Sequence, residues 1–550
     1  MKKFLILDCY VDEPTCLGVP PFVSPYPRYI YGALISSGLS PENIVYKTID
    51  HLREDGYNFT EDYSHVFIIG GAVVPGKYLG SRIGTLSEIN RILDQNNKTK
   101  MSIGGSISPL IKSISSNISI IQYDIDKFAF TLMQGNSVDK KRTIEESALW
   151  SIKGSEIVKR HPWYPNIICE IETGRGCPRK VHCSFCSEGL DREIEFRRTE
   201  DIINEIDALI SWGVSRFRIG KQADIIQYGT MLGKYNNGFP QPNTYTVKEL
   251  FGELKKRKES GKIEVLNVDN ANPGTIVNWP DESSIILEAI TDAVTPGDTL
   301  PFGIESFDES VVLQNNLKVM PDDALFAIRL VNEIGGKRED GIPKLLPGIN
   351  LIHGLKGETT DTFKINYKYL ERIVSEELLI KRINIRKLQP YPGTVIFNER
   401  YKIGNAVTKR FEYYRDRIRN EIDNSMLKNI YPQGVILKNV CVLDSRNGYS
   451  IGKQIASYSI AVKTPTLFQK MNFIDVIVTA HRERSLMSIP VPFNINRVSQ
   501  KNFEIIPGIS KAKASQLILK RPFQTIDSFA DELPNVKSDL LKIIIERASV

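Results

Sequence analysis

The stretch "GRGCPRKVHCSFCSEG", residues 174–189, places three cysteines within ten residues, at Cys177, Cys183 and Cys186. The 550-residue chain has only seven cysteines, an odd number and too few for a disulfide framework. A group of three thiols indicates a metal site in a reducing compartment, because thiolates are soft ligands that suit zinc or an iron–sulfur cluster. Three thiolates on a four-iron cluster leave one iron open to a substrate or cofactor.

A structural zinc site is the alternative, and it needs four ligands. Cys169 and His182 are the candidates for a fourth ligand near the three cysteines. Cys169 falls within an expected strand, and His182 is adjacent to Cys183, where it is poorly placed to chelate the same metal. We therefore favour the iron–sulfur cluster.

From residue 166 to about residue 400, strand-like apolar runs alternate with amphipathic helical stretches. About six such βα units predict a (β/α)6-type partial barrel, whose active site should lie at the carboxyl ends of the strands. The expected strands are "NIICEIET", "RFRIGKQADI", "IEVLNVDNA", "LPFGIES", "KLLPGINLIHGL" and "KRINIRKLQPYPGT". The cysteine loop directly follows the first of them.

This cysteine loop resembles that of the radical S-adenosylmethionine (radical SAM) enzymes, whose aromatic residue before the last cysteine is kept as Phe185. The resemblance implies a [4Fe-4S] cluster on the three cysteines, with S-adenosylmethionine bound to the open iron. It also implies cleavage of that cofactor to a 5′-deoxyadenosyl radical, with electrons from a donor such as ferredoxin or flavodoxin. The family's usual spacing is C-x3-C-x2-C, whereas five residues separate Cys177 from Cys183 here. No catalytic residue beyond the cluster is identified.

The later strand ends resemble the family's cofactor-binding motifs in their order along the chain. "GIES" resembles the fourth-strand motif and "LPGINLIHGLKGET" the fifth-strand motif, while "GKQAD" stands where the family usually has Gly-Gly-Glu. "VDNANPG" ends the third strand with polar residues. Taken singly, each motif is also a plain strand end or turn. The residues expected to bind S-adenosylmethionine are Gln222, Asp224, Asn270, Glu305, Ser306, Ile349, Gly354 and Glu358.

Residues 1–111 repeat strand and helix, which predicts a doubly wound α/β domain, and residues 112–165 are expected to form a connector with short strands. The domain resembles the cobalamin-binding-like domain that precedes many radical SAM barrels. Its first loop keeps Asp12 and Gly18 of a D-x-H-x-x-G arrangement but has no histidine. Cobalamin binding therefore stays open, beside a flavodoxin-like domain that shapes the active-site mouth. A second cluster of the methylthiotransferase kind is not expected, since the region offers only Cys9 and Cys16.

Residues 401–430 are expected to form a basic helical linker, since 381–428 holds twelve Lys and Arg against five Asp and Glu. Residues 431–497 have short strands separated by turns, which predicts a small β-barrel. It resembles TRAM, an RNA-binding barrel of tRNA-modifying enzymes, with Tyr449 or Tyr458 to stack on bases. The cations expected to contact phosphates are Lys438, Arg446, Lys453, Arg482 and Arg484.

Residues 498–550 are expected to be helical, and "FEIIPGISKAKASQLILKRPF" resembles a helix–hairpin–helix nucleic-acid-binding unit. Gly508 would form the tight hairpin, and the next helix would start with N–H groups facing a phosphate beside Lys511 and Lys513. Ser510 replaces the usual second glycine. Such a unit also serves as a protein-interaction module.

The composition is that of a water-soluble globular protein, with 41% hydrophobic and 25% charged residues and a net charge of +6. The apolar runs are far shorter than a membrane-spanning helix. The N-terminus "MKKFLILDCYVDE" reaches acidic residues too soon for a signal peptide, so we expect a first strand and a cytoplasmic protein.

Together these features predict a radical SAM enzyme that modifies tRNA or another structured RNA, without a membrane partner. One alternative is a cobalamin-assisted radical methylase acting on a protein or a small molecule. The other is a non-catalytic iron–sulfur protein that only binds nucleic acid.

Overall fold

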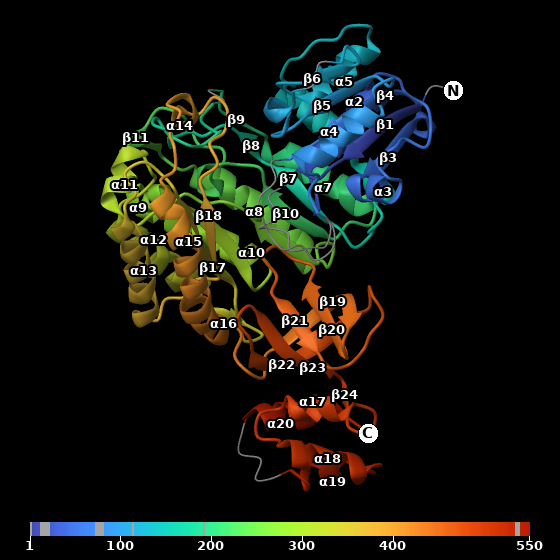
Figure 1. Ribbon diagram of the computed structural model, residues 1–550, viewed down its shortest axis with the longest axis vertical. Helices are drawn as coiled ribbons and strands as arrows, with labels where there is room; N and C mark the ends of the chain where they lie inside the picture. The colour runs from blue at the N-terminus through green and yellow to red at the C-terminus, as the bar shows by residue number, and fades with distance from the viewer. Residues whose placement is uncertain (1–2, 12–21, 72–81, 113–114, 191–192, 534–538) are drawn as a thin grey trace. The chain divides into compact units, whose positions relative to one another are not determined.

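The computed structural model describes residues 3–11, 22–71, 82–112, 115–190, 193–533 and 539–550 (Figure 1). They form two compact units, each described here by itself. The first unit consists of Met1–Thr295, Gln389–Tyr401 and Ala456–Tyr458, and the second of Pro296–Leu388, Lys402–Ile455 and Ser459–Val550. In the described part of the chain, no helix is both long and apolar enough to cross a membrane.

The first unit opens with a parallel sheet of strand order β3-β1-β4-β5-β6. Its strands are β1 (Lys3–Asp8), β3 (Ile44–Thr48), β4 (Tyr63–Ile69), β5 (Met101–Gly104) and β6 (Ile118–Ile120). Successive side chains of β1 face opposite sides, so Leu5 and Leu7 join one buried cluster and Phe4 and Ile6 another. Helices therefore cover both faces, which confirms the doubly wound prediction. They are α3 (Ile49–Glu54) and α4 (Leu86–Gln95) on one face, and α2 (Pro25–Ser36) and α5 (Ile125–Met133) on the other.

Residues 112–165 complete this domain instead of forming a connector with short strands. They supply β6 and α5, followed by α6 (Ile144–Lys153) and the 3-10 helix η3 (Ser155–Arg160). Thr143 and Glu146 form a reciprocal capping box at the start of α6, a local signal that favours a helix. Ile125 and Phe128 pack into the same core as β1.

A second sheet of the first unit carries the cysteine loop and has the order β13-β10-β7-β2. Its strands are β2 (Phe22–Val23), β7 (Ile168–Glu172), β10 (Arg216–Gly220) and β13 (Val265–Val268), all paired in parallel. The helices between them are α7 (Thr199–Ser211) and α8 (Thr244–Glu259). The edge strand β2 comes from the N-terminal domain and was not predicted, because two residues carry no periodicity.

The second unit begins with three more parallel strands in the order β14-β17-β18. They are β14 (Asp298–Glu305), β17 (Leu345–His353) and β18 (Arg382–Lys387), separated by α12 (Pro321–Gly335) and α13 (Thr360–Ser375). The six predicted barrel strands are thus present, three in each unit. The basic segment that follows is helical, as predicted, in α15 (Asn405–Arg417), the π-helical η5 (Ile418–Asp423) and α16 (Asn424–Ile430).

A closed five-stranded barrel follows, as predicted, with the order β19-β20-β21-β23-β22. Its strands are β19 (Ile436–Arg446), β20 (Tyr449–Gln454), β21 (Ala461–Thr464), β22 (Phe473–His481) and β23 (Ser485–Val491). All pairs are antiparallel except β21 with β23.

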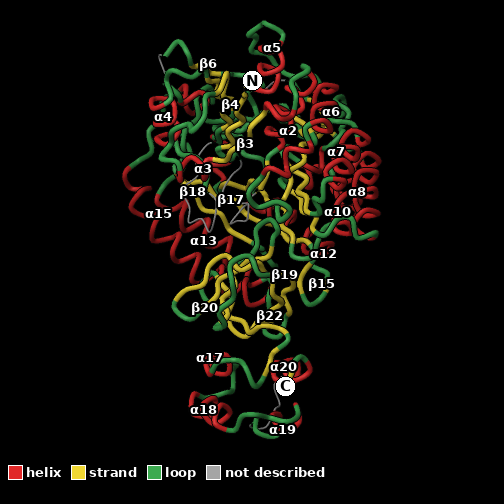
Figure 2. The backbone as a smooth tube through the Cα atoms, turned by 90° about the vertical axis from the view of Figure 1, so that its right-hand side faces the viewer, coloured by secondary structure: helices red, strands yellow, loops and turns green. Residues whose placement is uncertain are grey.

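The C-terminal helices share a hydrophobic core with this barrel. Both views place α17 (Gln500–Glu504), α18 (Lys511–Leu519), α19 (Ile526–Ala530) and α20 (Asp539–Glu546) together near the C-terminus (Figure 2). Ile477 and Ile489 of the barrel pack with Phe503, Leu517 and Leu540 of the helices. A parallel pair of short strands, β24 (Phe493–Asn494) and β25 (Ala548–Ser549), ties the end of the chain to the segment after the barrel. Residues 431–497 and 498–550, predicted as two domains, are therefore joined by one core.

Candidate active site

The cysteine loop leaves the carboxyl end of β7 through a tight antiparallel clamp. The clamp pairs β8 (Gly174–Arg175) with β9 (Glu195–Phe196). A Cβ on Gly174 would lie 2.5 Å from Glu195 O, and a Cβ on Gly176, at φ +76°, would lie 2.5 Å from Glu193 O. Glycine is therefore required at both positions, because the two ends of the loop approach backbone to backbone.

The three predicted ligands lie in this one loop, and none of them forms a disulfide. Cys183 is buried and Cys177 and Cys186 are half-buried, and the Cys186 N–H donates to Cys183 O at 3.2 Å. Arg179 Nη1 lies 3.2 Å from Cys183 Sγ. The guanidinium thus places a positive charge beside the sulfur of one predicted ligand.

The two candidates for a fourth ligand are engaged elsewhere. Cys169 is fully buried in β7, and burial raises the pKa of its thiol to about 12. His182 Nε2 lies 3.1 Å from Cys177 O, and a Cβ on Gly189 would lie 2.6 Å from the His182 ring. Within the described residues, no three His, Cys, Asp or Glu side chains converge as ligands for a single metal ion. A donor set of three thiols fits a four-iron cluster with one open iron.

The outer side of the cysteine loop is held by two other segments of the first unit. Lys180 N–H donates to Gly238 O at 3.0 Å, and the Arg179 guanidinium lies 4.9 Å from the Phe239 ring centroid. Ser184 O accepts from Ile396 N–H at 3.0 Å, at the start of α14 (Val395–Asn398). The contacts of Arg179 and Lys180 fix the long spacer between the first two cysteines, and that of Ser184 fixes the segment between the second and the third.

Gln222, Asp224 and Asn270, predicted to bind the cofactor, lie close together at the carboxyl ends of β10 and β13. The Gln222 amide accepts from Thr173 Oγ1 at 3.1 Å and donates to Asp269 O at 2.9 Å. Asp224 accepts from Asn272 N–H at 3.1 Å and from Thr275 Oγ1 at 2.6 Å. Asn270, at φ +31°, accepts from Ile225 N–H through its carbonyl. Gln222 and Asp224 therefore connect neighbouring loops through side-chain hydrogen bonds.

In the second unit, Glu305 and Ser306 end strand β14. Glu305 is buried and adopts φ +68°, a left-handed conformation that costs energy for a non-glycine residue. A Cβ on Gly303 would collide with Lys318 Nζ and lie 2.7 Å from Glu305 Oε1, so the glycine makes room for the ammonium beside the carboxylate. Ser306 Oγ lies 3.4 Å from Asn366 Oδ1 and 3.1 Å from Asp308 N.

Ile349 lies in β17, and Gly354 and Glu358 lie in the loop that follows this strand. Ile349 shares a strand face with His353, whose ring stacks on Phe363 of α13 with 4.2 Å between the ring centroids, so the Ile349 side chain lies on the side of the sheet that α13 covers. Glu358 Oε1 lies 2.6 Å from His353 Nδ1, and its other oxygen accepts from Gly354 N–H. Gly354 adopts φ +96° in the turn after β17, and the hydrogen bond from its N–H to the Glu358 carboxylate stabilises that turn.

The opposite face of β17 and β18 carries a row of polar residues that sequence reasoning missed. Asn350 pairs with Asn384, and their side chains are joined at 2.8 Å. Arg382 and Arg386 share this face of β18, and Arg382 Nε donates to Asn384 Oδ1 at 2.8 Å. The signal was the alternation in "RINIRK", in which every second residue is polar.

A sequence model described as the Radical SAM superfamily matches residues 171–370. An uncharacterized protein of Methanocaldococcus jannaschii is 39% identical over 511 residues, covering 88% of this chain and 92% of that protein. An uncharacterized protein of Archaeoglobus fulgidus is 35% identical over 519 residues, covering 92% and 93%.

The chain therefore contains a radical SAM domain within residues 171–370. Among solved structures, the cobalamin-dependent S-adenosylmethionine radical enzyme OxsB with aqua-cobalamin and S-adenosylmethionine bound gives a TM-score of 0.48 at 14% identity. The alignment covers 76% of this chain and 56% of that one, so the chain spans a little over half the length of that structure.

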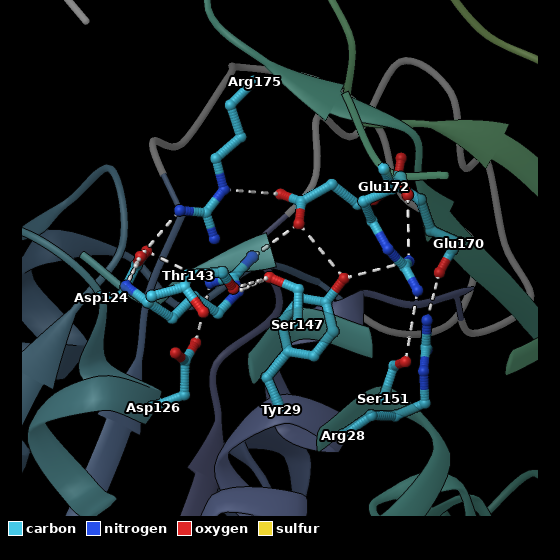
Figure 3. A network of polar contacts seen from close by, with 12 residues as sticks. Arg28, Tyr29, Asp124, Asp126, Thr143, Ser147, Ser151, Glu170, Glu172 and Arg175 are labelled. Atoms are coloured by element: carbon cyan, nitrogen blue, oxygen red, sulfur yellow. Dashed lines mark hydrogen bonds and ion pairs between the residues drawn. The ribbon is translucent and has the colours of Figure 1, made fainter. Parts of the chain in front are cut away.

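A buried ionic network fastens the first strand of the radical SAM domain to the N-terminal domain (Figure 3). Glu172 of β7 pairs with Arg142 at 2.5 Å and accepts from Tyr29 Oη at 3.1 Å. Arg142 also pairs with Asp126 at 3.0 Å. Arg175, inside the clamp of the cysteine loop, pairs with Asp124 at 2.7 Å. The network thus runs from the N-terminal domain to the base of the cysteine loop.

A second part of the network surrounds Glu205 of α7. Glu205 is fully buried between Arg28 of α2, at 2.8 Å, and Arg197, at 2.5 Å. Although burial raises it, Arg197 and Arg28 hold the pKa of Glu205 below its usual range. Arg28 also donates to the carbonyl of Glu170 in β7. None of these residues was singled out from the sequence, because the partners lie far apart along the chain.

The residues predicted to contact nucleic acid lie in the second unit. Arg482 and Arg484 are exposed in the turn between β22 and β23. Gly508 is exposed at φ +91°, and a Cβ there would meet nothing, so the φ angle and not crowding requires the glycine. Lys511 is exposed, whereas Lys513 pairs with Glu532 at 3.4 Å. Tyr458, predicted as a stacking residue, is buried and is not available to a base.

Proposed function

We propose that this radical SAM protein modifies a structured RNA, with tRNA as the preferred class. The observation that carries the proposal is the α17–α18 hairpin, which exposes Gly508 and Lys511 at the start of α18. Ser510 caps that helix by accepting from Lys513 N–H at 3.2 Å, which leaves the neighbouring N–H groups of the first turn for an anion.

The closed barrel supports the same proposal. Counting β19 to β23 as strands 1 to 5, the third and fifth strands are parallel, which is the strand order of five-stranded oligonucleotide-binding barrels. Those barrels bind nucleic acid with strands 2 and 3 and with the loops between strands 1 and 2 and between strands 4 and 5. The 4–5 loop here contains Arg482 and Arg484.

Cys177, Cys183 and Cys186 would hold a [4Fe-4S] cluster, and the guanidinium of Arg179 would lie beside the Cys183 ligand. When bound, such a cluster supplies the electron for reductive cleavage of S-adenosylmethionine at its open iron. Lys318 and Glu305 place an ammonium and a carboxylate together at the end of β14, where they can pair with the charged groups of a bound amino acid moiety.

The experiment is anaerobic reconstitution followed by assay of 5′-deoxyadenosine release, with and without bulk tRNA. Mass spectrometry of RNA from cells with and without the gene then identifies a modified nucleoside. We expect cofactor cleavage that depends on the three cysteines, and one nucleoside that is lost with the gene. Cofactor cleavage without any change in cellular RNA would reject RNA as the substrate.

A cobalamin-assisted methylase is the second candidate, favoured by the order of the N-terminal sheet. In a doubly wound sheet the ligand binds at the carboxyl ends where the strand order reverses, which here is between β1 and β4. Asp12, Cys16 and Gly18 of the predicted cobalamin loop lie outside the described residues. Absorbance of bound cobalamin after incubation with hydroxocobalamin and desalting would support this candidate, and a colourless protein would reject it.

A further inference from the structure

The spacer between the first two predicted cluster ligands, residues 178–182, carries a guanidinium to the sulfur of the second ligand. Arg179 Nη1 donates to Cys183 Sγ at 3.2 Å. Arg179 is only 8% exposed and Cys183 only 6%, so bulk water screens this contact little. A guanidinium carries a positive charge at any physiological pH, so a fixed charge lies beside one predicted ligand.

The Arg179 side chain is also held from its other side. Its guanidinium lies 4.9 Å from the ring centroid of Phe239, a buried residue of β12 (Phe239–Pro240). Next to these two residues, Lys180 N–H donates to Gly238 O at 3.0 Å. A guanidinium that packs on an aromatic ring keeps its orientation, so the fold itself directs the N–H group of Arg179 at the sulfur.

The spacer has five residues instead of the family's usual three, and it forms a compact loop. His182, its last residue, folds back so that Nε2 lies 3.1 Å from Cys177 O. A Cβ on Gly189 would lie 2.6 Å from the His182 ring, so the next part of the loop packs directly against that ring. The longer spacer is therefore an ordered feature of the loop, and it brings the Arg179 side chain to a ligand sulfur.

We propose that Arg179 raises the reduction potential of the cluster that the three cysteines would hold, acting through the Cys183 sulfur. Hydrogen bonds to the sulfurs and the local charge are among the factors that set the potential of an iron–sulfur cluster. The proposal rests on the cluster of the proposed function and not on its RNA substrate. It assigns Arg179 as a positioning residue, because it acts through a ligand.

The direction of the effect follows from charge. Reduction takes one electron from an external donor such as ferredoxin or flavodoxin, which is oxidised, and adds one negative charge to the cluster and its sulfurs. A charged N–H donor beside one of these sulfurs stabilises the reduced state more than the oxidised state. A donor of a given potential therefore reduces a larger fraction of the protein when Arg179 is present.

The test measures the midpoint potential of the full-length protein after anaerobic reconstitution, from the EPR signal of the reduced cluster at a series of poised potentials. We expect Arg179→Gln to lower the ratio of reduced to oxidised cluster by about tenfold at a given potential, a downward shift of about 59 mV for one electron. Arg179→Lys keeps the charge without the planar fork, so its midpoint should fall between the two.

Lys180→Gln is the matched control for the loss of a neighbouring cation. The Lys180 ammonium lies 4.3 Å from the centroid of the Tyr235 ring, which directs it at that ring, so this variant should keep the wild-type midpoint. The iron content of every variant is measured first. Equal midpoints in the wild type and Arg179→Gln, at equal iron content, would overturn the proposal and leave the proposed function standing.

A second measurement uses the wild type alone and applies even where Arg179→Gln fails to bind a cluster. In protein labelled with the heavy nitrogen isotope in its arginines, pulsed EPR of the reduced cluster should detect coupling to an arginine nitrogen. The absence of this coupling would overturn the proposal. A wild type that binds no iron–sulfur cluster would overturn both the proposal and the proposed function. A lowered midpoint in Arg179→Gln without any modified RNA would support the proposal and reject only the RNA substrate.

Discussion

At the scale of single residues, the cysteine loop was predictable because its chemistry is local. Cys177, Cys183 and Cys186 are close in sequence, so their proximity in space follows from one short loop. The roles of Gln222 and Glu358 were not predictable in the same way. Their partners, Asp269 O and His353 Nδ1, are set by how strand ends meet, and a local sequence motif does not specify such contacts.

The first prediction concerns the metal content of cysteine variants. Substituting alanine for Cys177, Cys183 or Cys186 should each abolish stable binding of iron and sulfide after anaerobic reconstitution. Cys169→Ala is the matched control, because this thiol is buried in β7 and should not bind the cluster. Iron content and visible absorbance are the readouts, and loss of the cluster in Cys169→Ala would identify a fourth ligand.

The second prediction concerns stability at acid pH. Burial lowers the pKa of His65 from 6.5 to about 4, and its Nε2 lies 2.7 Å from Ser102 Oγ. The unfolded chain therefore binds a proton on this side chain between about pH 6.5 and 4 when the folded chain does not. Stability should fall as the pH drops through this window, by about 3 kcal/mol for this one group.

His65→Gln keeps a polar atom near Ser102 and removes the titration. Urea unfolding between pH 4 and 7 should show a shallower pH dependence in this variant than in the wild type. Superimposable pH profiles would show that His65 does not cause the loss.

At the scale of elements, the strands and helices with clear periodicity were predicted. The shortest strands, and the contacts between residues far apart in the sequence, were not. β17 and β18 were recognised from their apolar runs, whereas the two-residue β2 was not. The connector was misread because residues 118–120 form a strand that is only half-buried, which weakens the apolar signal. The network around Glu205 joins α2, α7 and β7, and pairs that are up to 177 residues apart leave no local pattern.

The third prediction tests that network. Glu205→Gln leaves two buried guanidinium groups, those of Arg28 and Arg197, without their carboxylate. The free energy of unfolding should drop by about 3–5 kcal/mol, because an uncompensated buried charge is far more costly than a lost surface pair. Glu61→Gln is the control: its pair with Lys3 is exposed, so its loss should change the stability little. Equal effects of the two substitutions in urea unfolding would contradict this interpretation.

At the scale of the whole molecule, the fold class and the order of modules were predicted, but the way modules depend on one another was not. The barrel and the C-terminal helices differ in secondary structure, which suggested two domains. Hydrophobic residues of both contribute to one cluster, and no sequence pattern reports which apolar residues will meet.

The fourth prediction follows from this shared core. Leu517 is fully buried in it, so Leu517→Ala should cost about 2–5 kcal/mol and loosen the barrel as well as α18. Hydrogen exchange should accelerate in β22 and β23 together with α18. Leu519→Ala, two residues away and 84% exposed, should leave exchange unchanged. Faster exchange confined to the helices would show that the two parts unfold independently.

The pairing of β2 with β7 has a consequence for how this architecture can be shortened. A chain starting near residue 166 would present β7 as an open edge and would leave Glu205 without the guanidinium of Arg28. An unprotected parallel strand edge templates pairing with other copies, so such a fragment should aggregate during refolding. The catalytic half-barrel could lose its leading domain in evolution only together with changes that cap this edge and neutralise that carboxylate.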